Sequence, residues 1–192
     1  MEPLLFATNN PHKVSEIRAA LGNEFNIISL EEAGIKTDIP EPHITLEANA
    51  SEKSKTIYTI TNKNCFGEDT GLEVEALHGE PGVKSARYAG EGRSFEDNIA
   101  KLLQGLEGKT NRNARFRTII SLILEGKEYI FEGICPGRII SSGKGMNGFG
   151  YDPVFIPDGS EKTFAEMELP EKNNFSHRKK AIDKLIIFLN NK

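Results

Sequence analysis

The sequence predicts an α/β fold in which a mixed, elongated central sheet is flanked by helices. Three observations predict it: short apolar runs that end at turn residues, longer segments with apolar residues at helical spacing, and two β-rich segments joined by a short polar turn. With 192 residues the chain can bury a substantial core. We therefore expect one domain over residues 1–192, with two lobes.

The first elements alternate between strand and helix. Residues 4–8 form an apolar run that stops at the polar residues 9–11, as a buried strand does before a turn. Apolar positions then recur at helical spacing from Lys13, and Gly22 is a stop signal. Residues 26–30 predict a second strand, followed by a loop in which Glu41 lies between two prolines.

The next predicted helix carries a lysine on its apolar stripe. Thr45 is suited to cap this helix. Residues at helical spacing form the stripe, and they are Leu46, Ala50, Lys53 and Ile57. Lys53 either packs its stem and extends its amine to water, or faces a site inside the protein.

An acidic pair follows a predicted strand end at residues 64–67. Mg²⁺ prefers oxygen ligands and usually takes only one or two carboxylates, which Glu68 and Asp69 can supply together with Glu41. In a regular strand Glu68 and Asp69 point to opposite faces, so both approach one ion only if a turn starts at Thr70-Gly71. The alternative is that they are solvated surface charges.

The second half of the chain predicts a helix, a hairpin and a glycine-rich loop. Ser94 and Asp97 open a helix with a long apolar face, formed by Phe95, Ile99, Leu102, Leu103 and Leu106. Residues 114–124 and 129–134 are β-rich and predict a hairpin, so the sheet is mixed. A loop over residues 143–150 precedes a brief strand at residues 154–156.

Two polar segments are candidate anion sites. The turn at residues 8–13 offers backbone N–H groups, side-chain donors and a lysine to a polyphosphate, although it also fits a plain capped turn. It lacks the spacing of a Walker loop. The last helix begins at Ser176, and His177 and Arg178 in its first turn oppose the helix dipole, which a bound phosphate would explain. They are otherwise solvated helix-start residues.

Composition argues against several classes of protein. Lys and Arg total 24 against 28 Asp and Glu, a formal net charge of -4 without long charged blocks, which disfavours a nucleic-acid-binding face. The N-terminus shows neither a signal peptide nor a membrane span, so we expect a cytoplasmic protein. Cys65 and Cys135 lack metal-ligand spacing, and we expect two reduced, buried thiols.

Five motifs, taken in order, resemble those of the inosine triphosphate pyrophosphatases, also called the Ham1-like non-canonical purine nucleoside triphosphatases. They run nearly from end to end: Thr8-x-Asn10-x-x-Lys13, Glu68-Asp69-Thr70-Gly71-Leu72, Pro81-Gly82-Val83-Lys84-Ser85-Ala86-Arg87-Tyr88, Phe149-Gly150-Tyr151-Asp152-Pro153 and Ser176-His177-Arg178. The resemblance implies a fold with two lobes and an active-site cleft between them, and a homodimer.

The same resemblance implies roles for individual residues. Glu41 and Asp69 would hold Mg²⁺, with Glu68 as a further candidate ligand, and Asp69 would activate water, with Lys53 as the second catalytic residue. Phosphate contacts would come from residues near the first turn and from cations elsewhere: Thr8, Asn9, Asn10, Pro11, His12, Lys13, Lys53 and Arg87. Thr70 would contact substrate. The base and sugar would be bound by Phe149, Gly150, Tyr151, Asp152, Lys172, His177 and Arg178. Phe149 and Tyr151 otherwise fit simple loop packing.

Two positions depart from the family pattern. Glu68 stands where the family more often has Asp, and Ala48 stands where a Glu is usual, a loss that Glu47 partly replaces. Glu68 is longer than Asp by one methylene, which shifts the position of its carboxylate relative to the family pattern.

The activity implied is Mg²⁺-dependent hydrolysis of ITP, dITP and XTP to the nucleoside monophosphate and pyrophosphate, which removes deaminated purines from the nucleotide pool. Nucleic acids and membranes are not expected partners. Three other functions stay open on the residues alone: a Mg²⁺-dependent phosphatase that releases orthophosphate, a nucleotide sensor without turnover, and a nucleic-acid-binding module.

Overall fold

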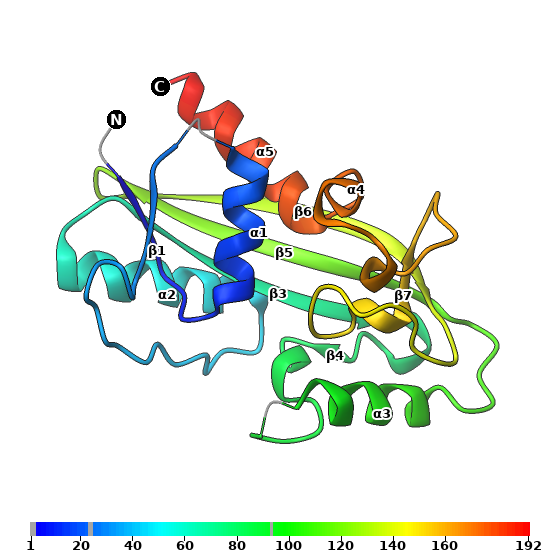
Figure 1. Cartoon of the computed structure of the whole chain (residues 1–192). Coiled ribbons are helices and arrows are strands. Elements are labelled where there is room, and N and C mark those ends of the chain that lie inside the picture. The colour runs from blue at the N-terminus through cyan, green and yellow to red at the C-terminus, as the bar shows by residue number, and fades with distance from the viewer. Residues whose placement is uncertain (1–2, 23–24, 93) are drawn as a thin grey trace. The chain divides into compact units, whose positions relative to one another are not determined.

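The computed structural model describes residues 3–22, 25–92 and 94–192 and has the predicted mixed α/β architecture (Figure 1). Its helices are α1 (Pro11–Leu21), α2 (Leu46–Thr61), α3 (Phe95–Gly105), α4 (Leu169–Asn173) and α5 (His177–Asn190). Its strands are β1 (Leu4–Phe6), β2 (Ile27–Ser29), β3 (Cys65–Val74), β4 (Pro81–Gly82), β5 (Asn113–Leu124), β6 (Lys127–Ile139) and β7 (Phe155–Pro157).

The described strands form one sheet with the order β2-β1-β3-β5-β6-β7, and β4 pairs with β3. Parallel pairing joins β1 to β2 and to β3, whereas β4 and β7 pair antiparallel with β3 and β6. The two-residue turn of Glu125 and Gly126 joins β5 to β6, and both residues have positive φ. Such turns match the twist of a hairpin, so the predicted hairpin and mixed sheet are confirmed.

The chain divides into two compact units, each described here by itself. Unit 1 comprises Met1–Asp69, Thr118–Gly133 and Arg178–Lys192, and unit 2 comprises Thr70–Arg117 and Ile134–His177. The divisions fall inside β3, β5 and β6 and after the first residue of α5. Whether the chain acts as a single domain with a cleft between two lobes stays a prediction.

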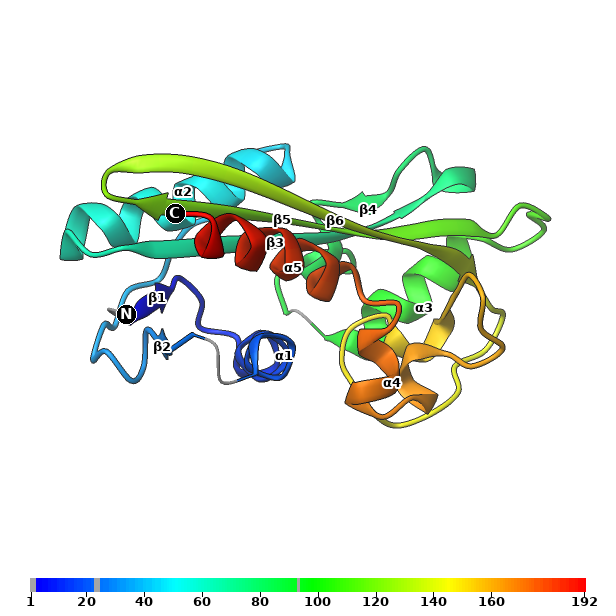
Figure 2. The ribbon, with the colours of Figure 1, turned by 90° about the horizontal axis from the view of Figure 1, so that it is seen from above.

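Unit 1 has helices on both faces of its strands (Figure 2). Because side chains alternate along a strand, Leu4 and Phe6 pack with α1 and α5, whereas Leu5 and Ala7 pack on the α2 side. The predicted stripe of α2 is buried throughout, including Lys53. Thr45 caps α2 as predicted, since its hydroxyl accepts a hydrogen bond from Ala48 N.

Unit 2 builds its own core around α3. Leu102 and Leu106 are fully buried against Leu72, Phe116 and other apolar side chains of this unit. Ser94 caps α3 as predicted, accepting from Asp97 N. Phe95 departs from the predicted buried face: it is 38% exposed and its ring lies against Phe149 instead.

The predicted strand end before the acidic pair is wrong. Glu68 and Asp69 lie in the middle of β3, which continues to Val74 without a turn at Thr70 and Gly71. The reason is a close approach of other backbone: a Cβ on Gly67 would lie 2.4 Å from Ala50 O, and one on Gly71 would lie 2.6 Å from Gly82 O. These glycines therefore admit neighbouring backbone to a straight strand.

Two smaller predictions have clear outcomes. Cys65 and Cys135 are buried free thiols, as predicted. Burial also raises the pKa of the Cys65 thiol to about 12, which keeps it protonated. Among the helices of the described residues, none combines the length and the apolar character that crossing a membrane requires.

Candidate functional site

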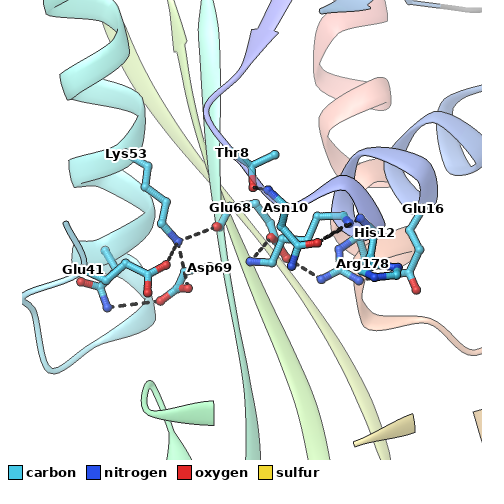
Figure 3. Close-up of polar contacts among 11 residues, drawn as sticks. Thr8, Asn10, His12, Glu16, Glu41, Lys53, Glu68, Asp69 and Arg178 are labelled. Atoms are coloured by element: carbon cyan, nitrogen blue, oxygen red, sulfur yellow. Dashed lines mark hydrogen bonds and ion pairs between the residues drawn. The ribbon is translucent and has the colours of Figure 1, made fainter. Parts of the chain in front are cut away.

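Glu41, Lys53 and Asp69 lie together in unit 1, on the α2 side of β3, and we call them the acidic cluster. The Lys53 amine lies 2.5 Å from a Glu41 carboxylate oxygen and 3.1 Å from Asp69 Oδ1, and it donates to the carbonyl of Glu68 (Figure 3). The Lys53 side chain is only 7% exposed, so its amine does not extend to water. The snorkelling alternative is therefore wrong for this lysine.

Helix α2 also fixes the second oxygen of Asp69. The Asn49 amide, which is fully buried, donates to Asp69 Oδ2 at 3.2 Å and also to the carbonyl of His43. Asp69 thus has one partner on each oxygen, and both come from one rigid helix. Since a carboxylate oxygen has two acceptor positions, each oxygen keeps capacity for a further ligand.

Burial and charge shift the pKa values of this cluster. Burial raises the pKa of Asp69, and the carboxylates of Glu41 and Glu68 add to it, against the opposing effect of Lys53 and Lys13. For Lys53, burial alone would lower the pKa, but Asp69 and Glu41 outweigh it and raise the pKa above its ordinary value. Lys53 is therefore a fixed positive charge, and Asp69 is a stronger base than an exposed aspartate.

Glu68 points to the opposite face of β3, toward α1 and α5. Its carboxylate lies 2.7 Å from Lys13 Nζ and accepts from the Arg178 guanidinium at 3.0 Å. Arg178 in turn donates to the Glu16 carboxylate (Figure 3). Burial lowers the pKa of Arg178, but Glu68 and Glu16 reverse that effect and raise it. We call Glu16, Arg178, Glu68 and Lys13 the charge relay.

The charge relay changes the interpretation of two predicted site residues. Because β3 has no turn, Glu68 does not approach the ion site of Glu41 and Asp69. Arg178 is 2% exposed and is neutralised by two carboxylates, so it needs no bound phosphate and is not a solvated helix-start residue. It belongs to unit 1, whereas the aromatic residues predicted to bind the base belong to unit 2.

The polar turn at residues 8–13 is a helix-capping structure. Asn10 Oδ1 accepts from the backbone N–H groups of His12 and Lys13, and Asn10 N donates to the Thr8 hydroxyl. Asn9 donates to the carbonyl of Thr37. Pro11 occupies the first turn of α1, where its missing N–H costs nothing. The turn therefore has the cap of the plain-turn alternative, its phosphate contacts stay a prediction, and Lys13 joins this turn to the charge relay.

Unit 2 gathers most of the residues predicted to bind the base. The Lys172 amine lies 2.6 Å from Asp152 Oδ2, and both side chains are only 4% exposed. The same carboxylate accepts from Phe149 N at 2.9 Å. Lys172 Nζ also lies 5.6 Å from the centre of the half-buried Phe149 ring. This pair therefore fixes the backbone and one face of Phe149.

The other predicted residues of unit 2 have mixed environments. Tyr151 is buried and donates to the carbonyl of Ser85, as in the loop-packing alternative. His177 is buried, with its ring stacked 4.6 Å from that of Phe116. Gly150 has φ 62, a conformation that favours glycine. Two further predicted residues are half-buried. They are Thr70, within β3, and Arg87, which ends a 3-10 turn.

The carboxylates of the acidic cluster suit a magnesium ion. Within residues 3–22, 25–92 and 94–192, no group of three or more His, Cys, Asp and Glu side chains is gathered closely enough to hold a metal. Mg²⁺ needs fewer protein ligands, because water and substrate phosphate complete its octahedron. Glu41 and Asp69 converge on one positive charge, the Lys53 amine, so they fit a two-carboxylate site.

Sequence reasoning missed Asn49 and Glu16. The available signal for Asn49 was an amide next to Ala50, a member of the predicted buried stripe of α2. Glu16 likewise lies next to an apolar position, Ile17, but its partner Arg178 is 162 residues away.

Comparison with known proteins identifies the family of this chain. The model of the Ham1 family matches residues 4–188. The chain belongs to the Ham1 family. It is 50% identical to a dITP/XTP pyrophosphatase of Flavobacterium johnsoniae over 97% of both chains, and 49% identical to one of Porphyromonas gingivalis over 98% of both. The structure of a HAM1 protein from Coxiella burnetii has a TM-score of 0.91 at 33% identity over 100% of both chains, and that of the Staphylococcus aureus Ham1 protein has a TM-score of 0.89 at 38% identity over 99% of both. The predicted family is confirmed.

Proposed function

We propose that this chain hydrolyses dITP, ITP and XTP to the nucleoside monophosphate and pyrophosphate, and so removes deaminated purines from the nucleotide pool. The observation that carries the proposal is the cluster on the α2 side of β3, where Asp69, Glu41 and Lys53 converge in a chain of the Ham1 family. Relatives that cover nearly the whole chain bear the name dITP/XTP pyrophosphatase.

Asp69 is the proposed catalytic base. It orients and deprotonates a water molecule, whose oxygen attacks the α-phosphorus while the bond to the α–β bridging oxygen breaks and pyrophosphate leaves. The raised pKa of Asp69 makes it a better proton acceptor, and its hydrogen bonds to Asn49 and Lys53 fix its direction. Lys53 supplies a positive charge for the transition state.

Glu41 and Asp69 are the proposed ligands of Mg²⁺, and water and phosphate oxygens would complete the coordination. The chemistry supplied by that ion, when bound, is neutralisation of charge on the phosphate oxygens. Lys13 and the polar turn at residues 8–13 would bind the phosphates, with Thr70 and Arg87 as further contacts. Glu68 serves as the partner of Lys13 and Arg178 in this proposal.

Phe149 is the proposed stacking partner of the purine, and Lys172 and His177 would read its edge. The Lys172 amine is already paired with Asp152 beside the Phe149 ring, so it is positioned before substrate arrives. A polar group placed for the 6-oxo oxygen rejects an amine there, because an unpaired buried donor is costly. The chain would work as a cytoplasmic homodimer, each copy a single two-lobed domain over residues 1–192.

Product-resolved hydrolysis tests this proposal. ITP, dITP, XTP, ATP and GTP are incubated with the enzyme in Mg²⁺ or in EDTA, and chromatography separates pyrophosphate from orthophosphate. We expect monophosphate and pyrophosphate from the first three nucleotides, with loss of turnover in EDTA. Orthophosphate as the product would identify a phosphatase instead, and binding of ITP without turnover would identify a nucleotide sensor.

A further inference from the structure

We propose that Glu16 is a positioning residue for phosphate binding, acting on Lys13 through Arg178 and Glu68. The inference rests on the proposed function, because it takes Lys13 as a phosphate-binding residue. It assigns a role to a side chain in the second turn of α1 that belongs to none of the motifs described above.

The contacts form a series across three elements. Glu16 of α1 accepts from one nitrogen of the Arg178 guanidinium, in the first turn of α5. The other terminal nitrogen donates to Glu68 Oε1 on β3 at 3.0 Å (Figure 3). Glu68 Oε2 lies 2.7 Å from Lys13 Nζ, back on α1. The two ends of the series therefore belong to the same helix.

Burial increases along the series toward its centre. The Lys13 side chain is 15% exposed, whereas those of Arg178 and Glu68 are 2% and 0% exposed. Two carboxylates alternate with two cationic side chains, so the net charge of the four side chains is zero. A buried guanidinium that loses one carboxylate has to compensate with the other. Without the Glu16 charge, Arg178 would draw on both oxygens of Glu68, and Lys13 would lose its anchor.

Holding Lys13 has a direct benefit for phosphate binding. A lysine ammonium on a free four-carbon stem loses rotamer freedom when it is fixed on a ligand. Lys13 is already fixed beside the backbone N–H groups at the start of α1, which Asn10 caps. Phosphate therefore meets an ammonium whose ordering has been completed in the free protein.

The test is a double-mutant cycle on Glu16 and Lys13. Glu16→Gln removes the charge and keeps the shape, and Lys13→Met removes the proposed endpoint. Isothermal titration measures the binding of inorganic pyrophosphate, and steady-state kinetics with ITP separate KM from kcat. We expect Glu16→Gln to weaken pyrophosphate binding and raise KM by about tenfold with kcat little changed, and to have less than about a twofold effect in the Lys13→Met background.

The matched control is Glu32→Gln. Glu32 also pairs with an arginine of α1, Arg18 at 2.5 Å, but that pair is exposed. We expect its KM and pyrophosphate affinity to match the wild type. Glu16→Asp, which keeps the charge, should restore part of the affinity, and this variant serves if Glu16→Gln fails to fold.

Equal effects of Glu16→Gln with and without Lys13, or an effect no larger than that of Glu32→Gln, would overturn the proposal. If the wild type binds pyrophosphate but does not hydrolyse ITP, the proposed function fails and the titration alone decides the role of Glu16.

Discussion

Glu68 and Asp69 are neighbours on one strand, yet their carboxylates lie on opposite faces of β3 and have different partners. On the α1 and α5 face, Glu68 belongs to the charge relay, in which two acids balance two bases and the side chains at the centre are almost fully buried. On the α2 face, Asp69 and Glu41 share a single lysine, which leaves an excess of one negative charge.

This difference separates structural from chemical use of the same functional group. A balanced, buried set of charges has no need for a further ion, and removing any member leaves the set with one uncompensated charge. In the acidic cluster two carboxylates pair with the one amine of Lys53, and the Glu41 side chain is 19% exposed. An excess of negative charge that solvent can reach suits a divalent cation and a reactive base. We therefore expect substitutions on the relay to reduce stability most and those on the acidic cluster to reduce activity most.

The largest expected effect is that of Asp69→Asn on turnover. Loss of the base should reduce kcat for ITP by about 10²–10⁴-fold. The free energy of unfolding should stay near the wild-type value, because burial already opposes ionisation of this carboxyl and the amide keeps its shape. Glu68→Gln is the matched variant on the adjacent residue. A loss of stability in Asp69→Asn as large as that in Glu68→Gln, measured by urea unfolding, would break the comparison between the two faces.

Arg178→Met should have the largest effect on stability. It leaves Glu16 and Glu68 buried without their shared counter-charge, and breaking a buried pair in this way costs about 3–5 kcal/mol. Urea unfolding followed by circular dichroism measures the change. Lys53→Met is the comparison on the other face, where one of the two remaining carboxylates is partly exposed, and we expect a smaller loss there. Equal losses would show that the two clusters do not differ in kind.

The extent to which these two faces were predictable depends on the range of the interactions. Helical spacing placed Lys53 on a buried stripe, whereas the predicted turn, which would have brought Glu68 and Asp69 to one ion, was wrong because β3 is continuous and its side chains alternate between faces. The straight course of β3 was not predictable, because Gly67 and Gly71 resemble turn residues until α2 and Gly82 are seen against them. The partners of Arg178 were equally hidden, since Glu16 and Glu68 lie 162 and 110 residues away. Family motifs predicted the site residues but not which of them neutralise one another.

Gly67→Ala tests whether the acidic cluster depends on the close approach of α2 to β3. The new methyl group would lie 2.4 Å from Ala50 O and 2.7 Å from Lys53 Cβ. The backbone of α2 would have to shift to relieve these contacts. Overpacking of this kind costs about 1–3 kcal/mol. Because α2 carries Lys53 and Asn49, we also expect kcat for ITP to fall. Gly159→Ala is a control in open surroundings, where the nearest atom is 3.7 Å away, although its positive φ adds some strain there. Unchanged kcat in Gly67→Ala would show that catalysis does not depend on the close approach of α2 to β3.

Magnesium should distinguish the two faces in the variants that lack their central cation. In Lys53→Met the two carboxylates lose the cation on which they converge, so Mg²⁺ should bind them and raise the melting temperature. At about ten times its dissociation constant an ion adds about 1.4 kcal/mol to the free energy of unfolding. In Arg178→Met the remaining carboxylates, those of Glu16 and Glu68, are buried, and we expect no such rise. Differential scanning fluorimetry with Mg²⁺, against K⁺ at equal ionic strength, makes the measurement.

The smallest expected effect concerns Glu32, whose exposed pair with Arg18 of α1 contrasts with the buried pairs of the charge relay. Hydrogen bonds from Arg18 and from the backbone of Ser29 lower the pKa of Glu32 to about 2, against an ordinary value of 4.5. A carboxyl with a lowered pKa stabilises the fold above pH 4.5, and this contribution is lost as the pH falls from 4.5 toward 2. Glu32→Gln should therefore be less stable than the wild type at pH 7, and the difference should shrink below pH 4.5 and in high salt, because exposed pairs are screened. Urea unfolding at pH 7 and pH 3 measures both proteins. A difference that is unaffected by pH would mean that the Glu32 carboxylate contributes through packing rather than charge, and the contrast between exposed and buried pairs on α1 would then lose its electrostatic basis.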